Sequence, residues 1–302
     1  METSRNAALF AVLCAVLTTM IWAGNAIMAR GLGADLPPVG LAFWRWLLAC
    51  VVFLPFALRP LLRDRKVILA NLPILLALAI PGVSFYNTFV YISLQTSPVA
   101  NTTMVICGTP ALILLFSNLL FKDPIRKRDW LGIALSILGV CVLLTKGDLL
   151  QLEKVFIGQG EIWALAAAVS WAIYSVLLKK RPEGIGQRSF VLFTFTIGML
   201  SLLPFAIYEH YHIKPMVFTQ TNILAILYVG LFASILAYLM WNNAVKVLGP
   251  SKVGTLLYMF PVFAVVGAAI ILGEGLELFH LIGILTVLSG VAILLIKRVK
   301  TS

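Results

Sequence analysis

The chain has 302 residues, of which 61% are hydrophobic and only 12% are charged, and its mean hydropathy is +1.01. A soluble domain usually carries about twice that share of charged residues, so the composition excludes a soluble globular protein. The net charge of +11 does not indicate nucleic-acid binding. The basic residues form short clusters between long apolar runs, which is typical of membrane-protein loops that face anionic lipid.

A helix that crosses a bilayer needs about 20 apolar residues. Scanning the chain with that length predicts an all-α integral membrane protein with ten transmembrane helices. The first apolar run is too long for the hydrophobic part of a cleaved signal peptide, so we expect it to remain as the first span. The predicted spans are residues 7–29, 38–58, 72–94, 97–120, 129–146, 160–179, 189–208, 222–246, 250–272 and 278–297.

Lys and Arg are divided unequally between the two sides of these spans. If the N-terminus is inside, 18 of the 23 basic residues lie on the inner side, four lie on the outer side, and Arg45 lies within the second span. The positive-inside rule then places both termini in the cytoplasm. We expect a bacterial plasma (inner) membrane as the location. The lipid bilayer and a small-molecule substrate are the expected partners, and the oligomeric state stays open.

The two halves of the chain resemble each other at a nearly constant offset. "WAGNAIMAR" from Trp22 matches "WAIYSVLLK" from Trp171 at 149 residues, and Pro110 matches Pro261 at 151 residues. Each half holds five predicted spans, an odd number, so the second copy must lie inverted in the membrane. Inverted repeats are typical of alternating-access transporters with a substrate site between the halves. The predicted repeats are residues 1–150 and 151–302.

Several longer motifs carry a family resemblance across almost the whole chain. They are "IWAGNAIMAR", "FWRWLLA", "PVANTTMVICGTPALILLF", "GIALSILGVCVLL" and "GPSKVGTLLYMFPVFAVVGAAIILGEGLELFHLIGILTVLSGVAILL". In order and spacing they resemble an EamA-type transporter of the drug/metabolite transporter superfamily. The resemblance implies ten helices and export of small metabolites or amino acids. "FKDP" at 121–124 departs from the usual Glu-containing turn, for which Asp123 is expected to substitute.

Polar and aromatic side chains recur at helical spacing within several spans. Such residues are costly in a membrane unless they face a cavity or another helix. A cavity of aromatic rings, amides and hydroxyls suits a small, partly apolar, uncharged or zwitterionic solute. Helix-to-helix hydrogen bonding and interfacial anchoring remain open alternatives for each residue. The predicted substrate-binding residues are Thr18, Trp22, Asn25, Arg45, Tyr86, Asn87, Tyr91, Trp171, Tyr174, Tyr238, Trp241 and Tyr258.

Arg45 is an isolated cation between Trp44 and Trp46, with no acidic residue close in sequence. It lies about seven residues past Pro38, which is roughly 10 Å below the outer end of the span. A snorkelling side chain that reaches the interface is one interpretation. A strut bonded to helix-end carbonyls near the outer mouth is the expected one. Electrostatic attraction of a substrate carboxylate is the third.

None of the twelve acidic residues lies near the middle of a predicted span. A buried carboxylate is the usual handle for proton coupling and for cationic drugs, so we expect facilitated transport or exchange. A proton-coupled multidrug or metabolite efflux pump and a non-transporting assembly protein are the alternatives. No HExxH motif or paired intramembrane aspartate is present, so neither an enzyme nor a cofactor or metal site is expected.

Small residues and prolines are expected to shape the helices. Recurrent glycines in spans five and ten predict close helix packing. Mid-span prolines predict bends, because proline removes a backbone hydrogen bond. The glycines are Gly132, Gly139, Gly283 and Gly290, and the prolines are Pro81, Pro110 and Pro261.

Overall fold

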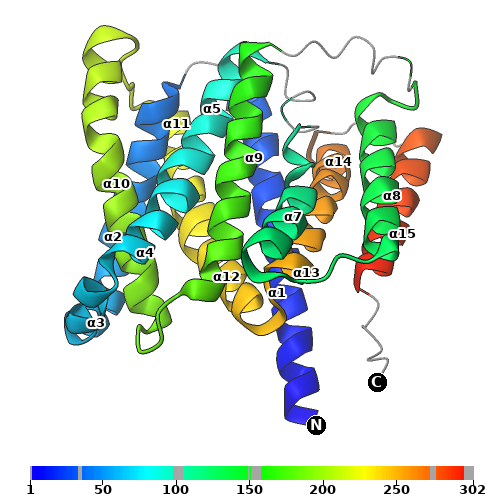
Figure 1. Ribbon diagram of the computed structural model, residues 1–302. Coiled ribbons are helices and arrows are strands. Elements are labelled where there is room, and N and C mark those ends of the chain that lie inside the picture. The colour runs from blue at the N-terminus through cyan, green and yellow to red at the C-terminus, as the bar shows by residue number, and fades with distance from the viewer. Residues whose placement is uncertain are drawn as a thin grey trace.

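The computed structural model describes residues 2–32, 36–97, 102, 105–148, 150, 158–272 and 277–295, and every element within them is a helix. The helices form one bundle, with the N-terminus extending from one end (Figure 1). The chain is therefore an all-helical membrane protein. Six helical stretches are long and apolar enough to span a membrane: Asn6–Asn25, Pro38–Arg63, Leu72–Thr96, Gln159–Lys180, Gln187–His212 and Gln220–Leu248.

Shorter helices occupy the other predicted spans, so the count of ten membrane crossings stays a prediction. Two spans are interrupted by the π-helical segments η2 and η5, one is interrupted by the 3₁₀ turn η6, and the 3₁₀ turn η4 follows the end of α9. The helices are α1 (Glu2–Leu32), α2 (Pro38–Arg63), α3 (Arg65–Ala70), α4 (Leu72–Ala79), α5 (Tyr86–Thr96), α7 (Thr109–Phe121), α8 (Lys127–Leu144), α9 (Gln159–Leu177), α10 (Gln187–His212), α11 (Gln220–Gly230), α12 (Ala237–Leu248), α13 (Pro250–Thr255), α14 (Met259–Leu272) and α15 (Leu278–Leu295). The bounds of these segments are η2 (Ile80–Phe85), η4 (Leu178–Lys180), η5 (Leu231–Leu236) and η6 (Leu256–Tyr258).

The outer surface of the bundle is rich in large apolar side chains. Phe10 on α1 is 61% exposed, Phe56 on α2 is 62% exposed and Leu119 on α7 is 75% exposed. An apolar surface this extensive would be unfavourable in water but is solvated by lipid tails. These helices therefore carry apolar side chains both on the faces that meet lipid and on the faces that pack inside the bundle.

Helix contacts follow the same scheme in the two halves of the chain. In the first half α1 packs on α12 and α14, and in the second half α9 packs on the corresponding helices α5 and α7. The corresponding helices α2 and α10 lie together at one edge of the bundle, and α8 and α15 lie together at the other (Figure 1). This exchange of partners places the centre of the molecule between α1, α5, α9 and α12.

The four predicted packing glycines hold α8 against α15. A Cβ on Gly139 would lie 2.7 Å from the backbone nitrogen of Val287 and 2.8 Å from the carbonyl oxygen of Gly283. A Cβ on Gly290 would lie 2.6 Å from the carbonyl oxygen of Gly132. The two backbones are in direct contact, which only glycine permits. The prediction of close packing at these glycines is confirmed.

The three prolines occupy two kinds of position, one within a π-helical segment and two in the first turn of a helix. Pro81 lies within η2, where the backbone departs from the α-helical pattern. Pro261 lies in the first turn of α14, directly after η6. The prediction that Pro110 bends a helix is wrong, because α7 begins at Thr109 and Pro110 occupies its first turn. Proline is favourable there, since its missing N–H would have no partner within the helix.

Two carboxylates tie α2 and α10 together at opposite ends. Asp64, just after α2, accepts hydrogen bonds from the backbone N–H of Gly186 (2.9 Å) and the hydroxyl of Ser189 (2.6 Å) at the start of α10. Glu209, near the end of α10, accepts from the backbone N–H of Gly40 (2.6 Å) at the start of α2. Each carboxylate thus satisfies free N–H groups at the positive end of the neighbouring helix.

Asp64 makes the stability of the protein depend on pH. The hydrogen bonds from Ser189 and Gly186 lower the pKa of the Asp64 carboxyl below its usual value of about 3.9. A lowered pKa stabilises the fold above the usual value, and that stabilisation is lost as pH falls through the folded-state pKa. We expect Asp64→Ala to lower the free energy of unfolding by about 1 kcal/mol at pH 7.

The measurement is thermal unfolding of the detergent-purified protein from pH 7 to pH 3. The difference in melting temperature between wild type and Asp64→Ala should become smaller as the pH falls below about 3.9. Glu183→Gln is the matched control, because Glu183 is exposed in the turn before α10. If the difference in melting temperature between wild type and Asp64→Ala does not change with pH, the ionised Asp64 carboxylate does not stabilise the start of α10 as proposed.

Candidate functional site

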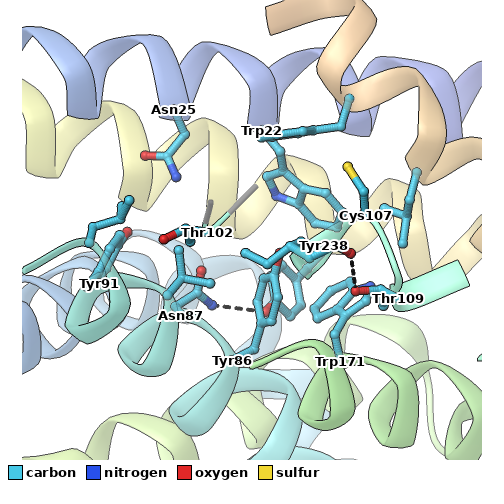
Figure 2. Close-up of a pocket in the computed structure, with 15 residues that line it drawn as sticks. Trp22, Asn25, Tyr86, Asn87, Tyr91, Thr102, Cys107, Thr109, Trp171 and Tyr238 are labelled. Atoms are coloured by element: carbon cyan, nitrogen blue, oxygen red, sulfur yellow. Dashed lines mark hydrogen bonds between the residues drawn. The ribbon is translucent and has the colours of Figure 1, made fainter. Parts of the chain in front are cut away.

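A pocket opens at the centre of the bundle, where α1, α5, α9 and α12 approach one another. Its cavity volume is about 100 Å³, which suits only a small part of a solute in this conformation. Figure 2 shows amide, hydroxyl and aromatic side chains directed into it. None of the described side chains that line it carries a formal charge. The lining residues are Trp22, Asn25, Tyr86, Asn87, Val90, Tyr91, Leu94, Thr102, Ile106, Cys107, Thr109, Trp171, Tyr238, Leu257 and Phe260.

Residues at matching positions in the two halves meet at this pocket. Trp22 and Trp171, 149 residues apart, contact edge to face with 5.0 Å between their ring centroids. Asn87 and Tyr238, 151 residues apart, are joined by a hydrogen bond of 3.4 Å from Nδ2 to the hydroxyl oxygen (Figure 2). Matched residues can touch only near an axis that relates the two halves. The pocket therefore lies at the junction of the halves.

The two π-helical segments flank the pocket and supply backbone acceptors to it. η2 and η5 are also 151 residues apart, and a π-helix leaves some carbonyls without their usual i+4 donor. The Tyr238 hydroxyl donates to the carbonyl of Gly82 in η2. The Trp22 indole donates to the carbonyl of Ala233 in η5 over 3.1 Å. Gly82 and Ala233 occupy matching positions, so each half binds a side chain of the other at the same place.

An aromatic cluster closes the pocket on the side toward the N-terminal end of the bundle. Its members are Trp22, Trp171, Tyr174, Tyr238 and Trp241, with ring centroids of contacting pairs 5.0–6.4 Å apart. The Tyr174 hydroxyl donates to Oδ1 of Asn242 over 2.6 Å. The indole N–H groups of Trp171 and Trp241 have no acceptor among the described residues, and such orphaned buried donors call for an explanation.

Beyond this cluster lies a second, wider cavity of about 830 Å³. Asn242 lines it, together with Lys179, Arg181 and Lys246 at the ends of the helices nearest the N-terminus. Burial lowers the pKa of the Arg181 guanidinium. Lys179 forms an ion pair with Asp123, whose carboxylate also accepts from Ser117. Three basic side chains and one acidic one, Glu183, give this second cavity a positive lining.

Arg45 lies directly behind the pocket wall and is only 1% exposed. Its Nη1 donates to Oδ1 of Asn87 (2.7 Å) and to the hydroxyl of Tyr91 (2.8 Å). Nε and Nη2 donate to Oγ of Ser234 (3.0 and 2.9 Å), and Nη2 donates to the carbonyl of Ala233 (3.3 Å). The snorkelling interpretation is therefore wrong. The expected strut is correct in kind, but it joins three helical spans in the interior rather than helix ends.

The structure brings together seven of the twelve predicted substrate-binding residues at the pocket: Trp22, Asn25, Tyr86, Asn87, Tyr91, Trp171 and Tyr238. The other five lie behind its wall and are buried: Thr18, Arg45, Tyr174, Trp241 and Tyr258. Thr18 illustrates the difference, because its hydroxyl bonds to the carbonyl of Cys14 within its own helix (2.8 Å). The location of a residue at the pocket does not show that a substrate contacts it, so the substrate-binding role of all twelve residues stays a prediction.

Sequence reasoning missed eight lining residues. Five of them are apolar and give no signal in an apolar helix: Val90, Leu94, Ile106, Leu257 and Phe260. Thr102 and Cys107 lie between α5 and α7 and Thr109 is the first residue of α7, and their small polar side chains at short intervals were a usable signal. Thr102 bonds to Ser93 on α5 over 2.8 Å, which fixes that segment against the pocket.

An integral membrane protein with a central polar pocket between two related halves has the architecture of a membrane transporter. The sequence profile of the EamA-like transporter family matches this chain twice, at residues 9–145 and 158–296. The chain belongs to this family, and it is a membrane transporter. The family resemblance predicted from the sequence is thereby confirmed.

Curated relatives match along nearly the full length. An uncharacterized transporter of Archaeoglobus fulgidus is 27% identical over 95% of this chain and 97% of its own. A probable amino-acid metabolite efflux pump of Salmonella typhimurium is 24% identical over 92% of each chain. One solved crystal structure superposes with a TM-score of 0.76 over 94% of this chain and 95% of its own, at 22% identity, which supports the fold alone.

Proposed function

We propose that this protein exports small metabolites of the amino-acid class by alternating access between two inverted five-helix repeats. The observation that carries the proposal is the uncharged polar and aromatic pocket at the junction of the two halves. Amides and hydroxyls suit the polar head group of an amino acid, and Trp22, Tyr86 and Trp171 suit an apolar side chain. The Salmonella relative bears the name of an amino-acid metabolite efflux pump, which supports the same substrate class.

The proposed orientation places both termini in the cytoplasm of a bacterial inner membrane, with ten membrane crossings. The basic clusters support it, because Arg63, Lys122 and Lys179 lie at or just after the ends of α2, α7 and α9, on the N-terminal side of the bundle. In that orientation the wide, positively lined cavity opens inward and the aromatic cluster separates it from the pocket. Export would then require the cluster to part, so that a solute passes from the wide cavity to the pocket.

A proton-coupled pump for cationic drugs is less well supported. Such a pump needs a carboxylate at membrane depth, and no carboxylate lines the central pocket among the described residues. The described acidic side chains at α2, α8, α9 and α10 bond to backbone N–H groups at helix starts instead. Facilitated transport or exchange therefore remains the proposed mode.

Counterflow in proteoliposomes tests the proposal. Vesicles loaded with one unlabelled amino acid at a time should accumulate the same radiolabelled amino acid transiently and without a pH gradient. We expect a saturable signal for a subset of apolar amino acids and none in empty vesicles. A panel of all twenty amino acids that gives neither counterflow nor thermal stabilisation of the purified protein would refute the substrate class. Transport that depends strictly on a pH gradient would refute the mode.

A further inference from the structure

The guanidinium of Arg45 is fully occupied by the protein. An arginine has five N–H donors and no acceptor, and five hydrogen bonds from Arg45 are present: two to Ser234 and one each to Asn87, Tyr91 and Ala233. Its carbon Cζ also lies 4.8 Å from the ring centroid of Trp46. A substrate therefore finds no free donor on Arg45, which excludes direct binding of an anion to this side chain in the observed conformation.

The two bonds to the pocket wall fix the direction of hydrogen bonding there. Because Arg45 can only donate, it takes the carbonyl oxygen of Asn87 and leaves the amide NH₂ as the free end of that side chain. Arg45 likewise donates to the oxygen of Tyr91, so the phenolic proton of Tyr91 remains for another acceptor. Asn87 and Tyr91 both line the pocket (Figure 2). The wall in front of Arg45 thus presents two donors.

These donors are poorly used by the protein itself. The amide of Asn87 reaches only the Tyr238 hydroxyl, over a long 3.4 Å, and Tyr238 already donates to the carbonyl of Gly82. No acceptor for the Tyr91 proton is found among the described residues. The positive charge behind them is also uncompensated, because no ion pair to Arg45 exists within the described chain. A ligand acceptor, best an anionic one, would complete this arrangement.

We infer that the pocket recognises the carboxylate group of its substrate through Asn87 and Tyr91, and that Arg45 is the positioning residue that makes both of them donors. This inference rests on the proposed function, which supplies the amino-acid class, and narrows recognition to one group. Asn25, another polar side chain of the pocket lining, faces this wall and is left for the other polar end of the solute (Figure 2). Cations and uncharged amides are disfavoured by the same wall.

Equilibrium binding to the purified protein tests this inference without any transport step. The probes are L-leucine against L-leucinamide, and 4-methylpentanoate against 4-methylpentanamide, together with the corresponding phenylalanine series. Each pair differs at the carboxylate only. Wild type should bind the acid at least tenfold more tightly than the amide in each pair, because hydrogen bonds to an ionised group are the stronger ones.

Two substitutions separate recognition from structure. Tyr91→Phe removes one donor and keeps the ring, so the acid-to-amide preference should fall about tenfold. Asn87→Asp converts a donor into an acceptor that pairs with Arg45, so the preference should vanish or reverse toward leucinamide. Tyr228→Phe is the matched control, because it removes a hydrogen bond to the carbonyl of Ile21 away from the pocket lining and should leave the preference unchanged.

Each outcome decides the inference separately from the proposed function. Equal binding of acid and amide by wild type, or no binding of either acid series, overturns carboxylate recognition even if transport is observed. An unchanged preference in Tyr91→Phe overturns the assigned wall. Acid-selective binding that weakens in both pocket variants supports the inference, and it does so even if counterflow of amino acids fails.

Discussion

Gly290→Val is expected to separate α8 from α15 and to destabilise the protein strongly. A Cβ at this position would lie 2.3 Å from Oγ of Ser136 and 2.6 Å from the carbonyl oxygen of Gly132. Backbone atoms cannot move aside as a flexible side chain can, and a branched residue adds two further methyl groups. Overpacking typically costs about 1–3 kcal/mol, and we expect the upper end of that range here.

The measurement is the melting temperature of the purified protein in detergent, followed by size-exclusion chromatography after heating. Ser289→Val is the matched control, because Ser289 is the preceding residue, is exposed, and bonds only to the carbonyl of Leu285 in its own helix. It should melt close to wild type. Equal melting of Gly290→Val and wild type would contradict direct backbone contact between the two helices. Neither helix contributes to the pocket lining, so ligand binding by folded Gly290→Val should be retained.

Trp171→Leu is expected to abolish most ligand binding and transport. Trp171 is 1% exposed and its ring lies 4.7 Å from that of Tyr86 and 5.0 Å from that of Trp22, so it forms both a pocket wall and the centre of the aromatic cluster. Each aromatic pair contributes about 0.5–1.5 kcal/mol beyond area burial. If ligand binding uses the intact wall, the loss of two such contacts, about 1–3 kcal/mol, corresponds to a loss in affinity of about fivefold to 150-fold.

Trp163→Leu on the same helix is the control for this experiment. Trp163 contacts Phe89, with ring centroids 5.0 Å apart, and does not line the pocket. Both variants remove the same group of atoms from α9. Binding of L-leucine and proteoliposome counterflow should fail in Trp171→Leu and persist in Trp163→Leu. A parallel loss in both variants would indicate a general packing defect of α9 rather than a binding role for Trp171.

The apolar runs and the helical spacing of polar residues predicted the class of protein and a large part of the pocket. Trp22, Asn87, Trp171 and Tyr238 were found because each is a polar or aromatic interruption on one face of a span, and because two of them recur at a fixed offset. Tyr174 and Trp241 carry the same signal, yet they pack behind the pocket in the aromatic cluster. Periodicity identifies the inward face of a helix, but not how far each side chain lies from the cavity.

Arg45 shows what sequence alone could not supply. Its depth in the span was predicted, but its acceptors come from residues 42, 46, 188 and 189 positions away in the chain. Without those partners a lone cation between two tryptophans is equally compatible with an interfacial anchor. The two π-helical segments were not predicted either, because one additional residue in a helical turn does not change the hydropathy pattern. Gly82 lies in the first of these segments, but a glycine alone does not indicate a π-turn.

The π-helical segments impose an exact count of residues on the two spans that contain them. A π-turn holds about one residue more than an α-turn, so η2 and η5 each act as a one-residue insertion in an otherwise α-helical rod. Since each residue of an α-helix turns the chain by about 100°, removing one residue from η2 would rotate α5 by that angle relative to α4. Asn87 and Tyr91 would then face away from the pocket with their sequence unchanged. The number of residues within Ile80–Phe85 therefore constrains the proposed binding wall as strictly as side-chain identity does.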